Sequence, residues 1–213
     1  MKIRELFDKK TVFSFEIFPP KKTSSVDVIY KTLEELGDLS PDFISVTFSA
    51  GGSGNGSLSC EIASKIKDKY NITPMIHLPC INYTEDEILD VLNDLDTRGI
   101  ENILALRGDR NPNLQEKDDF KHASDLITYL KQKEDFCIAG ACYPECHPES
   151  ANRIEEMRHL REKVDAGAEV LLSQLFFDNN YFYRFVEDCR IAGIEVPITP
   201  GIMPVINAVQ IKR

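Results

Sequence analysis

Apolar residues gather in seven short runs along the chain, whose starts lie roughly 30 residues apart, the length of one strand–helix unit. Each run has the length of a buried strand. Near-continuous apolar strands that alternate with helices are typical of a parallel sheet with both faces covered. The predicted strands cover residues 12–16, 43–48, 74–78, 102–107, 137–143, 170–177 and 197–203.

Apolar residues at helical spacing predict helices between these strands. The clearest start is Thr84 followed by Glu87, a capping box in which each side chain serves the other residue's backbone N–H. Glycines follow several patterns, as expected at the C-terminal end of a helix. The predicted helices are 25–37 with Gly37 as its cap, the stretch from Thr84 to Gly99, the stretch led by Ser124-Asp125-Leu126, 151–166 before Gly167, and the stretch from Tyr181 to just before Gly193.

Seven units of equal length favour a closed (β/α)8 TIM barrel over an open doubly wound sheet, and the Gly-rich first turn of the latter is missing. No linker or change of composition divides residues 1–213, so one domain is expected. After the seventh strand the sequence holds only a short stretch that ends at Arg213, and an eighth strand and helix would need roughly 50–80 more residues. The expectation is a C-terminally incomplete TIM-barrel catalytic domain with open strand edges and low stability.

Composition and charge argue against several classes of protein. Of the 213 residues, 42% are hydrophobic and 28% charged, as in an ordinary globular protein. The formal net charge of −10 argues against non-specific binding to nucleic acid or to an anionic membrane surface. The first ten residues lack the apolar core of a signal peptide, and no run approaches a membrane span. A cytoplasmic protein with six reduced cysteines is therefore expected.

Polar residues recur where the predicted strands end, and in a parallel barrel these ends converge on one face. In the first strand, alternation places Phe13 and Phe15 outward under helices and Glu16 in the upper lumen, where a carboxyl is costly unless it is used. Each such residue alone has an equally good structural explanation, but their recurrence indicates a site. The residues are Glu16, Thr47, His77, Arg107 with Asp109, Tyr143 with Glu145 and His147, and Gln174 with Asp178.

Two glycine-containing segments differ in what they indicate. The segment from Ala50 to Ser57 has neither the Lys-Ser/Thr of a nucleotide-triphosphate loop nor the spacing of a dinucleotide fingerprint. It is either a lid or cofactor wall, or a plain connector. Arg107-Gly108-Asp109 instead places a cation, a glycine that permits close backbone approach, and an anion at one strand end. A phosphate or ribose could use the first two residues.

Seven sequence motifs stand at the strand ends: FSFEIFPPK, FISVTFSAGG, HLPC, NILALRGD, CYPECHPES, KVDAGAEVLLSQLFFD and PITPGIMPV. HLPC is weak by itself, whereas ALRGD, KVDAGA-x5-QLFFD and PGIMP are specific. In this order and with this spacing, over essentially the whole chain, they resemble the 5,10-methylenetetrahydrofolate reductase family.

The resemblance implies a TIM-barrel flavoenzyme of one-carbon metabolism and methionine biosynthesis that binds FAD non-covalently. Such an enzyme passes a hydride from NADH or NADPH to the flavin and then to methylenetetrahydrofolate, which gives 5-methyltetrahydrofolate. The implied catalytic residues are Glu16, the acid that assists opening of the methylene bridge, Asp109 beside flavin and folate, and Gln174, which touches folate and nicotinamide in turn. The implied substrate contacts are Thr47, Asp109, Gln174 and Gln210. The implied FAD contacts are Phe48, Ala50, His77, Arg107, Gly108, Asp109, Ala123, Tyr143, His147 and Lys163.

The sequence departs from the family pattern at several of these positions. Phe48 stands where a tyrosine is common, which removes a hydroxyl contact but keeps the ring. Glu156, His159 and Glu162 fall at FAD-contact positions where relatives carry Asp, Asn and a basic residue. Desolvation between aromatic neighbours should raise the pKa of Glu16, as a general acid requires, and Asp109 should raise it further.

Other readings of the residues remain open at this point. A zinc-dependent methyl-transfer barrel could use His77, Cys80, Cys142, Cys146 and His147, although their spacing fits no standard finger. The chain could also be a non-catalytic flavin- or folate-binding fragment that a partner subunit completes, and it could form homo-oligomers. The sequence does not distinguish NADH from NADPH, or direct reduction from electron delivery by a partner protein.

Overall fold

In the computed structural model, the chain forms one parallel sheet with helices between the strands. The structure describes residues 1–20, 25–48, 55–110, 116–133 and 135–207, except for the side chains of residues 55–57. The strands are β1 (Ser14–Ile17), β2 (Phe43–Val46), β3 (Thr73–Pro79), β4 (Asn102–Leu106), β5 (Cys137–Cys142), β6 (Val170–Ser173) and β7 (Ile198–Thr199). They pair in sequence order from β1 to β7, and every pairing is parallel.

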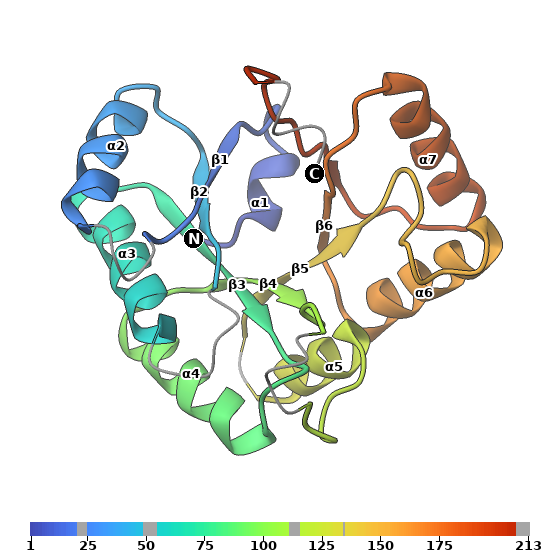
Figure 1. The fold of residues 1–213 in the computed structure, drawn as a ribbon, viewed down its shortest axis with the longest axis horizontal. Helices are drawn as coiled ribbons and strands as arrows, with labels where there is room; N and C mark the ends of the chain where they lie inside the picture. Colours follow the sequence, from blue (N-terminus) through green and yellow to red (C-terminus); the bar gives the residue numbers. More distant parts are fainter. Residues whose placement is uncertain (21–24, 49–54, 111–115, 134, 208–213) are drawn as a thin grey trace.

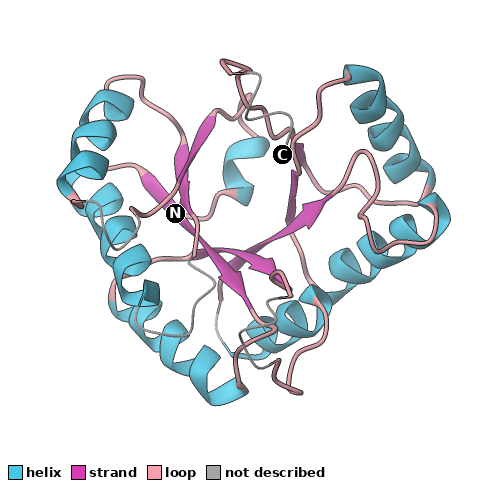
Figure 2. Ribbon diagram, viewed as in Figure 1, coloured by secondary structure: helices cyan, strands magenta, loops and turns pink. Residues whose placement is uncertain are grey.

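The helices between the strands surround the sheet, whereas the first helix lies on its inner side (Figure 1). This helix, α1 (Arg4–Phe7), precedes β1. The others are α2 (Asp27–Gly37), α3 (Asn55–Tyr70), α4 (Glu85–Thr97), α5 (Ala123–Lys133), α6 (Arg153–Ala166) and α7 (Asn179–Ile191). The result is a TIM-barrel-like α/β fold of seven strands, as the hydrophobic pattern predicts. Figure 2 shows these helices to the left of the strands, below them and to their right. None of the described helices combines the length and hydropathy needed to cross a membrane.

Alternation along the strands builds two separate apolar layers. Ile44, Ile76 and Ile103 belong to the large cluster between the strands and the surrounding helices. On the other face, Met75 and Leu104 belong to the cluster that fills the inside of the sheet, which also holds Phe43, Cys137, Ala139 and Val170. Ile3 and Leu6 of the α1 segment belong to this inner cluster as well, so α1 covers the lower end of the lumen.

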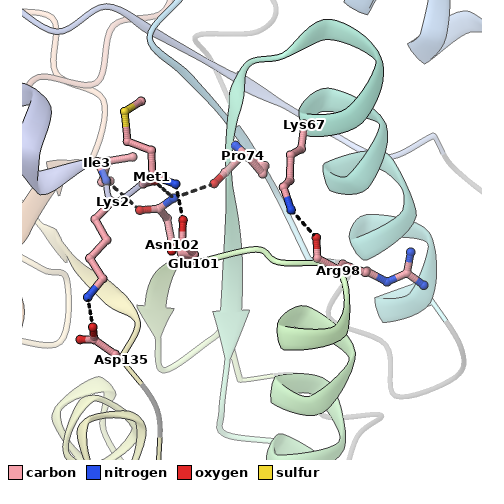
Figure 3. Close-up of polar contacts among 9 residues, drawn as sticks. All are labelled: Met1, Lys2, Ile3, Lys67, Pro74, Arg98, Glu101, Asn102 and Asp135. Atoms are coloured by element: carbon pink, nitrogen blue, oxygen red, sulfur yellow. Dashed lines mark hydrogen bonds and ion pairs between the residues drawn. The ribbon is translucent and has the colours of Figure 1, made fainter.

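A buried asparagine ties the N-terminal segment to the sheet (Figure 3). Asn102, 1% exposed, accepts a hydrogen bond from the N–H of Ile3 at 2.8 Å. Its amide donates to the carbonyls of Met1 at 3.0 Å and Pro74 at 3.1 Å. All three bonds cross between distant parts of the chain, so this amide fixes where α1 sits under the lumen.

Most predicted elements are confirmed, with boundary differences at the C-terminal strands. The capping box of Thr84 and Glu87 is present at the start of α4, and Gly99 and Gly167 take positive φ after α4 and α6. Strands β6 and β7 are shorter than predicted because the residues after Ser173 and Thr199 leave the ladder. Gly37 is the last helical residue of α2 rather than its cap, which is Asp38.

Two helices were not predicted, the short α1 and the longer α3. Residues 55–70 form α3, and its start falls within the segment interpreted as a connector up to Ser57. Its buried side chains include Ile62, Ala63 and Ile66, which have helical spacing and could have revealed it. The glycine-rich part of that segment, residues 50–54, lies outside the described residues, and so does the stretch 208–213. Two predicted contact residues, Ala50 and Gln210, fall in these stretches.

Candidate active site

On the inner face of the sheet, Glu16 and His77 lie toward the C-terminal ends of their strands. Glu16 is paired with Ser45 of β2, which is in turn paired with Met75 of β3. Since Met75 packs in the inner cluster, Glu16 shares the inner face with it, as predicted. His77 lies two residues beyond Met75 and is therefore on the same face, one layer higher.

Glu16 and His77 meet inside this face. Oε2 of Glu16 lies 3.5 Å from Nε2 of His77. His77 is 7% exposed, and its Nε2 is buried without a hydrogen-bond partner, whereas the Glu16 side chain is 45% exposed. Burial raises the pKa of Glu16 and lowers the pKa of His77 to about 4. Both shifts are toward the uncharged forms, and burial is the cause of each.

Asp109 does not act on Glu16 in the way the sequence suggested. Desolvation is the cause of the raised Glu16 pKa, with no contribution from a neighbouring charge. Asp109 is exposed, and its charge adds only a minor part to the raised pKa of Arg107, which the hydrogen bond to Glu149 mainly causes, and of Tyr143, which burial mainly causes. The expectation that Asp109 tunes Glu16 is therefore wrong, because the carboxyl group lies on the rim with the Arg107 guanidinium and not inside the sheet.

Arg107 is held at the end of β4 by a carboxylate that the sequence analysis did not identify. Its Nη1 and Nη2 donate to the two carboxylate oxygens of Glu149 at 2.6 and 2.7 Å. This fork lowers the pKa of Glu149 to about 2. Gly108 follows with φ +90°, and a Cβ there would stand 3.0 Å from Cβ of Pro79. Only glycine fits this turn without strain, so Gly108 fixes the direction in which the strand end leaves the sheet.

A buried carboxylate on α6 supports the loop that carries Glu149. Glu156 of α6 is 3% exposed and accepts from the N–H of His147 at 3.1 Å and from the hydroxyl of Ser150 at 2.7 Å. The N–H of Glu149 donates to Nδ1 of His147 at 3.1 Å, which tightens the loop further. Only the acidic residues that follow the fifth strand hinted at these roles in the sequence, because their partners are set by the loop conformation.

Lys163 and Tyr143 complete this part of the rim. Lys163 extends under the sheet end, where its ammonium donates to the carbonyl of Ala141 at 2.9 Å and lies 5.8 Å from the ring centroid of Tyr143. Burial lowers the pKa of Lys163 and raises that of Tyr143. The Tyr143 ring meets that of His147 edge to face at 4.7 Å. Three of the implied cofactor contacts are therefore neighbours.

The remaining predicted residues contact their local neighbours rather than other residues of the candidate site. Gln174 is exposed, and its amide oxygen accepts from the adjacent N–H of Leu175 at 2.8 Å. Thr47 is half-buried beyond β2, with its carbonyl bonded to the hydroxyl of Ser59 at 3.0 Å. Phe48 packs in the sheet–helix cluster with its ring edge toward Tyr83, so its ring is not presented to the lumen.

Four further residues near the strand ends differ in their surroundings. Ala123 is buried at the start of α5. His159 and Glu162 both contact the guanidinium of Arg158 on α6. The hydroxyl of Thr199, which sequence analysis did not consider, is buried without a hydrogen-bond partner in the part of the chain described. Thr199 is paired with Leu172, which packs in the inner cluster, and so it faces the lumen.

The proposed zinc ligands are not brought together. Cys80 packs in the large sheet–helix cluster and Cys142 in a third cluster with Phe185 and Cys189 under α6 and α7. Burial raises the pKa of the Cys80 thiol to about 12, which disfavours the thiolate that zinc binds. Within the described ranges, no group of three or more His, Cys, Asp or Glu side chains is placed to hold a metal ion.

Comparison with known protein families agrees with the motifs. A sequence model described as methylenetetrahydrofolate reductase matches residues 2–213. The 5,10-methylenetetrahydrofolate reductase of Escherichia coli K12 is 40% identical over 200 residues, which cover 94% of this chain and 67% of that protein. Methylenetetrahydrofolate reductase (NADH) 1 of Arabidopsis thaliana is 38% identical over 213 residues, or 93% of this chain and 36% of that protein. The chain thus spans about a third of the plant relative and two thirds of the bacterial one.

Solved structures that resemble this one at low identity support the fold alone. A Clostridium thermocellum protein, described as binding two copies of 5-methyl-5,6,7,8-tetrahydrofolic acid, aligns with a TM-score of 0.66 at 16% identity and covers 94% of this chain and 69% of that chain. Phosphonopyruvate hydrolase aligns with a TM-score of 0.62 at 14% identity, over 94% and 72% of the two chains. With the family model covering nearly every residue and relatives near 40% identity, the chain belongs to the methylenetetrahydrofolate reductase family.

Proposed function

We propose that residues 1–213 act as a single catalytic barrel domain that reduces 5,10-methylenetetrahydrofolate to 5-methyltetrahydrofolate, with FAD as cofactor and NAD(P)H as hydride donor. The observation that carries this proposal is the Glu16–His77 pair on the inner face of a barrel-like sheet. A carboxyl group with a raised pKa at that place suits protonation of a folate nitrogen near neutral pH. The family relationship supplies the substrate class.

The residues at the rim fit a flavin dinucleotide. Arg107 and Lys163 are cations next to a strand end, and the turn at Gly108 lets a ligand approach the backbone. Nε2 of His77 is a buried polar atom that lacks a hydrogen-bond partner, which a ligand could provide. FAD, when bound, supplies the hydride-transfer chemistry. Arg107, Lys163, His147 and Tyr143 would hold it, and the resemblance adds Ala123 at the start of α5.

The protein's own side chains then divide the remaining tasks. Glu16 holds the proton that opening of the folate methylene bridge requires. Asp109 places a negative charge on the rim, where a cationic folate intermediate would be stabilised. Gln174 and Thr47 are accessible at strand ends and can hydrogen-bond to folate and nicotinamide, although the Gln174 amide must first leave the Leu175 backbone. The Arabidopsis relative is named for NADH, which favours NADH as the donor to test first.

Separate half-reactions test this function. In Glu16→Gln, the rate of folate reduction should fall by about 10²–10⁴-fold, whereas the reduction of bound flavin by NADH should stay unchanged. The matched control is Glu34→Gln, an acid on the surface of α2 that pairs only with Lys69. Equal loss of both half-reactions would remove the acid role of Glu16. Purified protein with bound zinc and no flavin absorbance would reject the proposed function itself.

A further inference from the structure

We propose that His77 is the positioning residue for the acid: in the resting protein the carboxyl O–H of Glu16 donates its hydrogen bond to Nε2 of His77. This inference rests on the proposed function for its catalytic meaning, but the hydrogen bond itself can be tested without it. The resemblance assigns His77 only to the cofactor, and nothing there connects it with the proton of Glu16.

The geometry of the two strands brings these atoms together. Glu16 and His77 come from β1 and β3, with β2 between them, and both point to the inner face. Their side-chain atoms Oε2 and Nε2 lie 3.5 Å apart. Within the described part of the chain, Nε2 has no hydrogen-bond partner although it is buried. A buried polar atom left in this state is unfavourable, and a hydroxyl on Glu16 is in reach to bond it.

The side chains next to Glu16 and His77 on the inner face are apolar or do not titrate. Ser45 of β2 and Thr47, just beyond that strand, share the inner face, and neither side chain titrates. Below and beyond them β4 contributes Leu104 and Leu106, and β5 contributes Ala139. The titratable residues of the rim, Asp109, Tyr143 and Lys163, add nothing to the pKa shift of either group, for which burial is the cause.

The proposed hydrogen bond requires one protonation state of each group. A neutral imidazole whose hydrogen is on Nδ1 offers a lone pair at Nε2, and a protonated carboxyl offers an O–H. If Glu16 ionised, its carboxylate would face that lone pair, which is unfavourable. His77 therefore favours the protonated acid and directs its proton along a fixed line toward β3.

The proton balance of the reaction is then simple. Glu16 gives its proton from Oε2 to the folate nitrogen and becomes a carboxylate, while His77 stays neutral throughout. Because the Glu16 side chain is 45% exposed, it can recover a proton from solvent after the product leaves. His77 positions the acid and is not itself a proton donor in this scheme.

Nitrogen-15 NMR of the histidines in the full chain tests the assignment on the wild-type protein. At neutral pH the His77 signals should show a neutral ring with hydrogen on Nδ1 and an unprotonated Nε2 that accepts a hydrogen bond. A hydrogen on Nε2, or a charged ring, would overturn the proposal. The test needs no bound cofactor and no activity. An absence of flavin or of folate reduction would thus reject the proposed function while the ring state still decides this inference.

Infrared difference spectra of variants give the second test. The carboxylic C=O band that Glu16→Gln removes should be present near neutral pH and should move to higher frequency in His77→Leu, which lacks an acceptor. His77→Gln, whose amide oxygen can accept in place of Nε2, should restore most of the shift. The matched control is His122→Gln, an exposed histidine at the start of α5, which should leave the band in place. A band unchanged by His77→Leu, or absent from the wild type, would contradict the assignment.

Discussion

Two polar clusters at the same end of the sheet shift the pKa of a carboxyl group in opposite directions. Inside the sheet, Glu16 and His77 meet with no charged partner, and burial moves the pKa of each toward its neutral form. On the rim, Arg107 and Glu149 form a two-bond ion pair that pushes the Glu149 pKa down to about 2. Both regions contain carboxyl groups, but only the second surrounds them with donors.

The difference shows that carboxyl groups at this end of the sheet stand in two kinds of surroundings, one with hydrogen-bond donors and one without them. Glu156 is more buried than Glu16, at 3% exposed, yet it accepts from a backbone N–H and a hydroxyl. Glu16 has neither, and it faces the lone pair of an imidazole instead. The inner pair therefore suits a group that must give a proton away, and the rim suits groups that must keep a fixed charge for an anionic ligand.

Removal of the buried rim carboxylate should have the largest effect on stability. Glu156→Ala leaves the N–H of His147 and the hydroxyl of Ser150 without an acceptor, so we expect the free energy of unfolding to fall by about 3 kcal/mol. Chemical denaturation of the full chain measures this. The control Glu162→Ala, on the exposed side of α6, should cost less than about 0.5 kcal/mol. A similar small loss for Glu156→Ala would mean that the loop does not depend on it.

A methyl group at the turn after β4 should come next. Gly108 has φ +90° and a Cβ there would approach Cβ of Pro79 to 3.0 Å, so Gly108→Ala should lower the free energy of unfolding by about 1–3 kcal/mol. The same change should weaken FAD binding, because it alters the direction of Arg107. Thermal unfolding and flavin titration check both effects. Gly37→Ala, at a position without positive φ and with open packing, is the control. Stability equal to that of the control would show that the turn tolerates a side chain.

The elements of the fold were largely predictable, whereas the contacts of the site were not. Period and spacing located every strand, because an apolar run leaves few alternatives, and the inward direction of Glu16 followed from alternation alone. Helix α3 was overlooked because its start overlaps a glycine-rich segment. The partners of Arg107 and His77 could not be predicted from the sequence. Glu149 stands 42 residues from Arg107, and the two side chains meet only because of the loop that Glu156 supports.

Replacing Arg107 by lysine, which keeps the positive charge but loses the two-bond contact with Glu149, should have an intermediate effect on the affinity for FAD. Arg107→Lys retains the positive charge, yet an ammonium cannot donate two parallel bonds to Glu149. We expect the affinity for FAD to fall by about tenfold, a loss of about 1.4 kcal/mol, measured by titration of the flavin-free protein. Riboflavin, which lacks phosphates, should bind both proteins equally. Arg110→Lys, an exposed neighbour that pairs with Glu116, is the control and should change neither affinity. A loss of riboflavin binding equal to that of FAD would place the defect elsewhere than at the phosphates.

The two clusters should also respond to pH with opposite signs, which is the smallest effect. The pKa of Glu149 falls from 4.5 to about 2 on folding, so its ion pair stabilises the protein above pH 4.5 and loses this contribution as the pH drops toward 2. Glu16 has a raised pKa, so its contribution is present below its unfolded pKa and is lost as the pH rises through its folded pKa. Melting temperatures of wild type against Glu149→Gln should converge as the pH falls below 4.5, with a difference worth less than about 1 kcal/mol because the pair is exposed. Against Glu16→Gln, the wild type should instead gain stability as the pH falls, and the same sign for both variants would contradict the contrast between the two clusters.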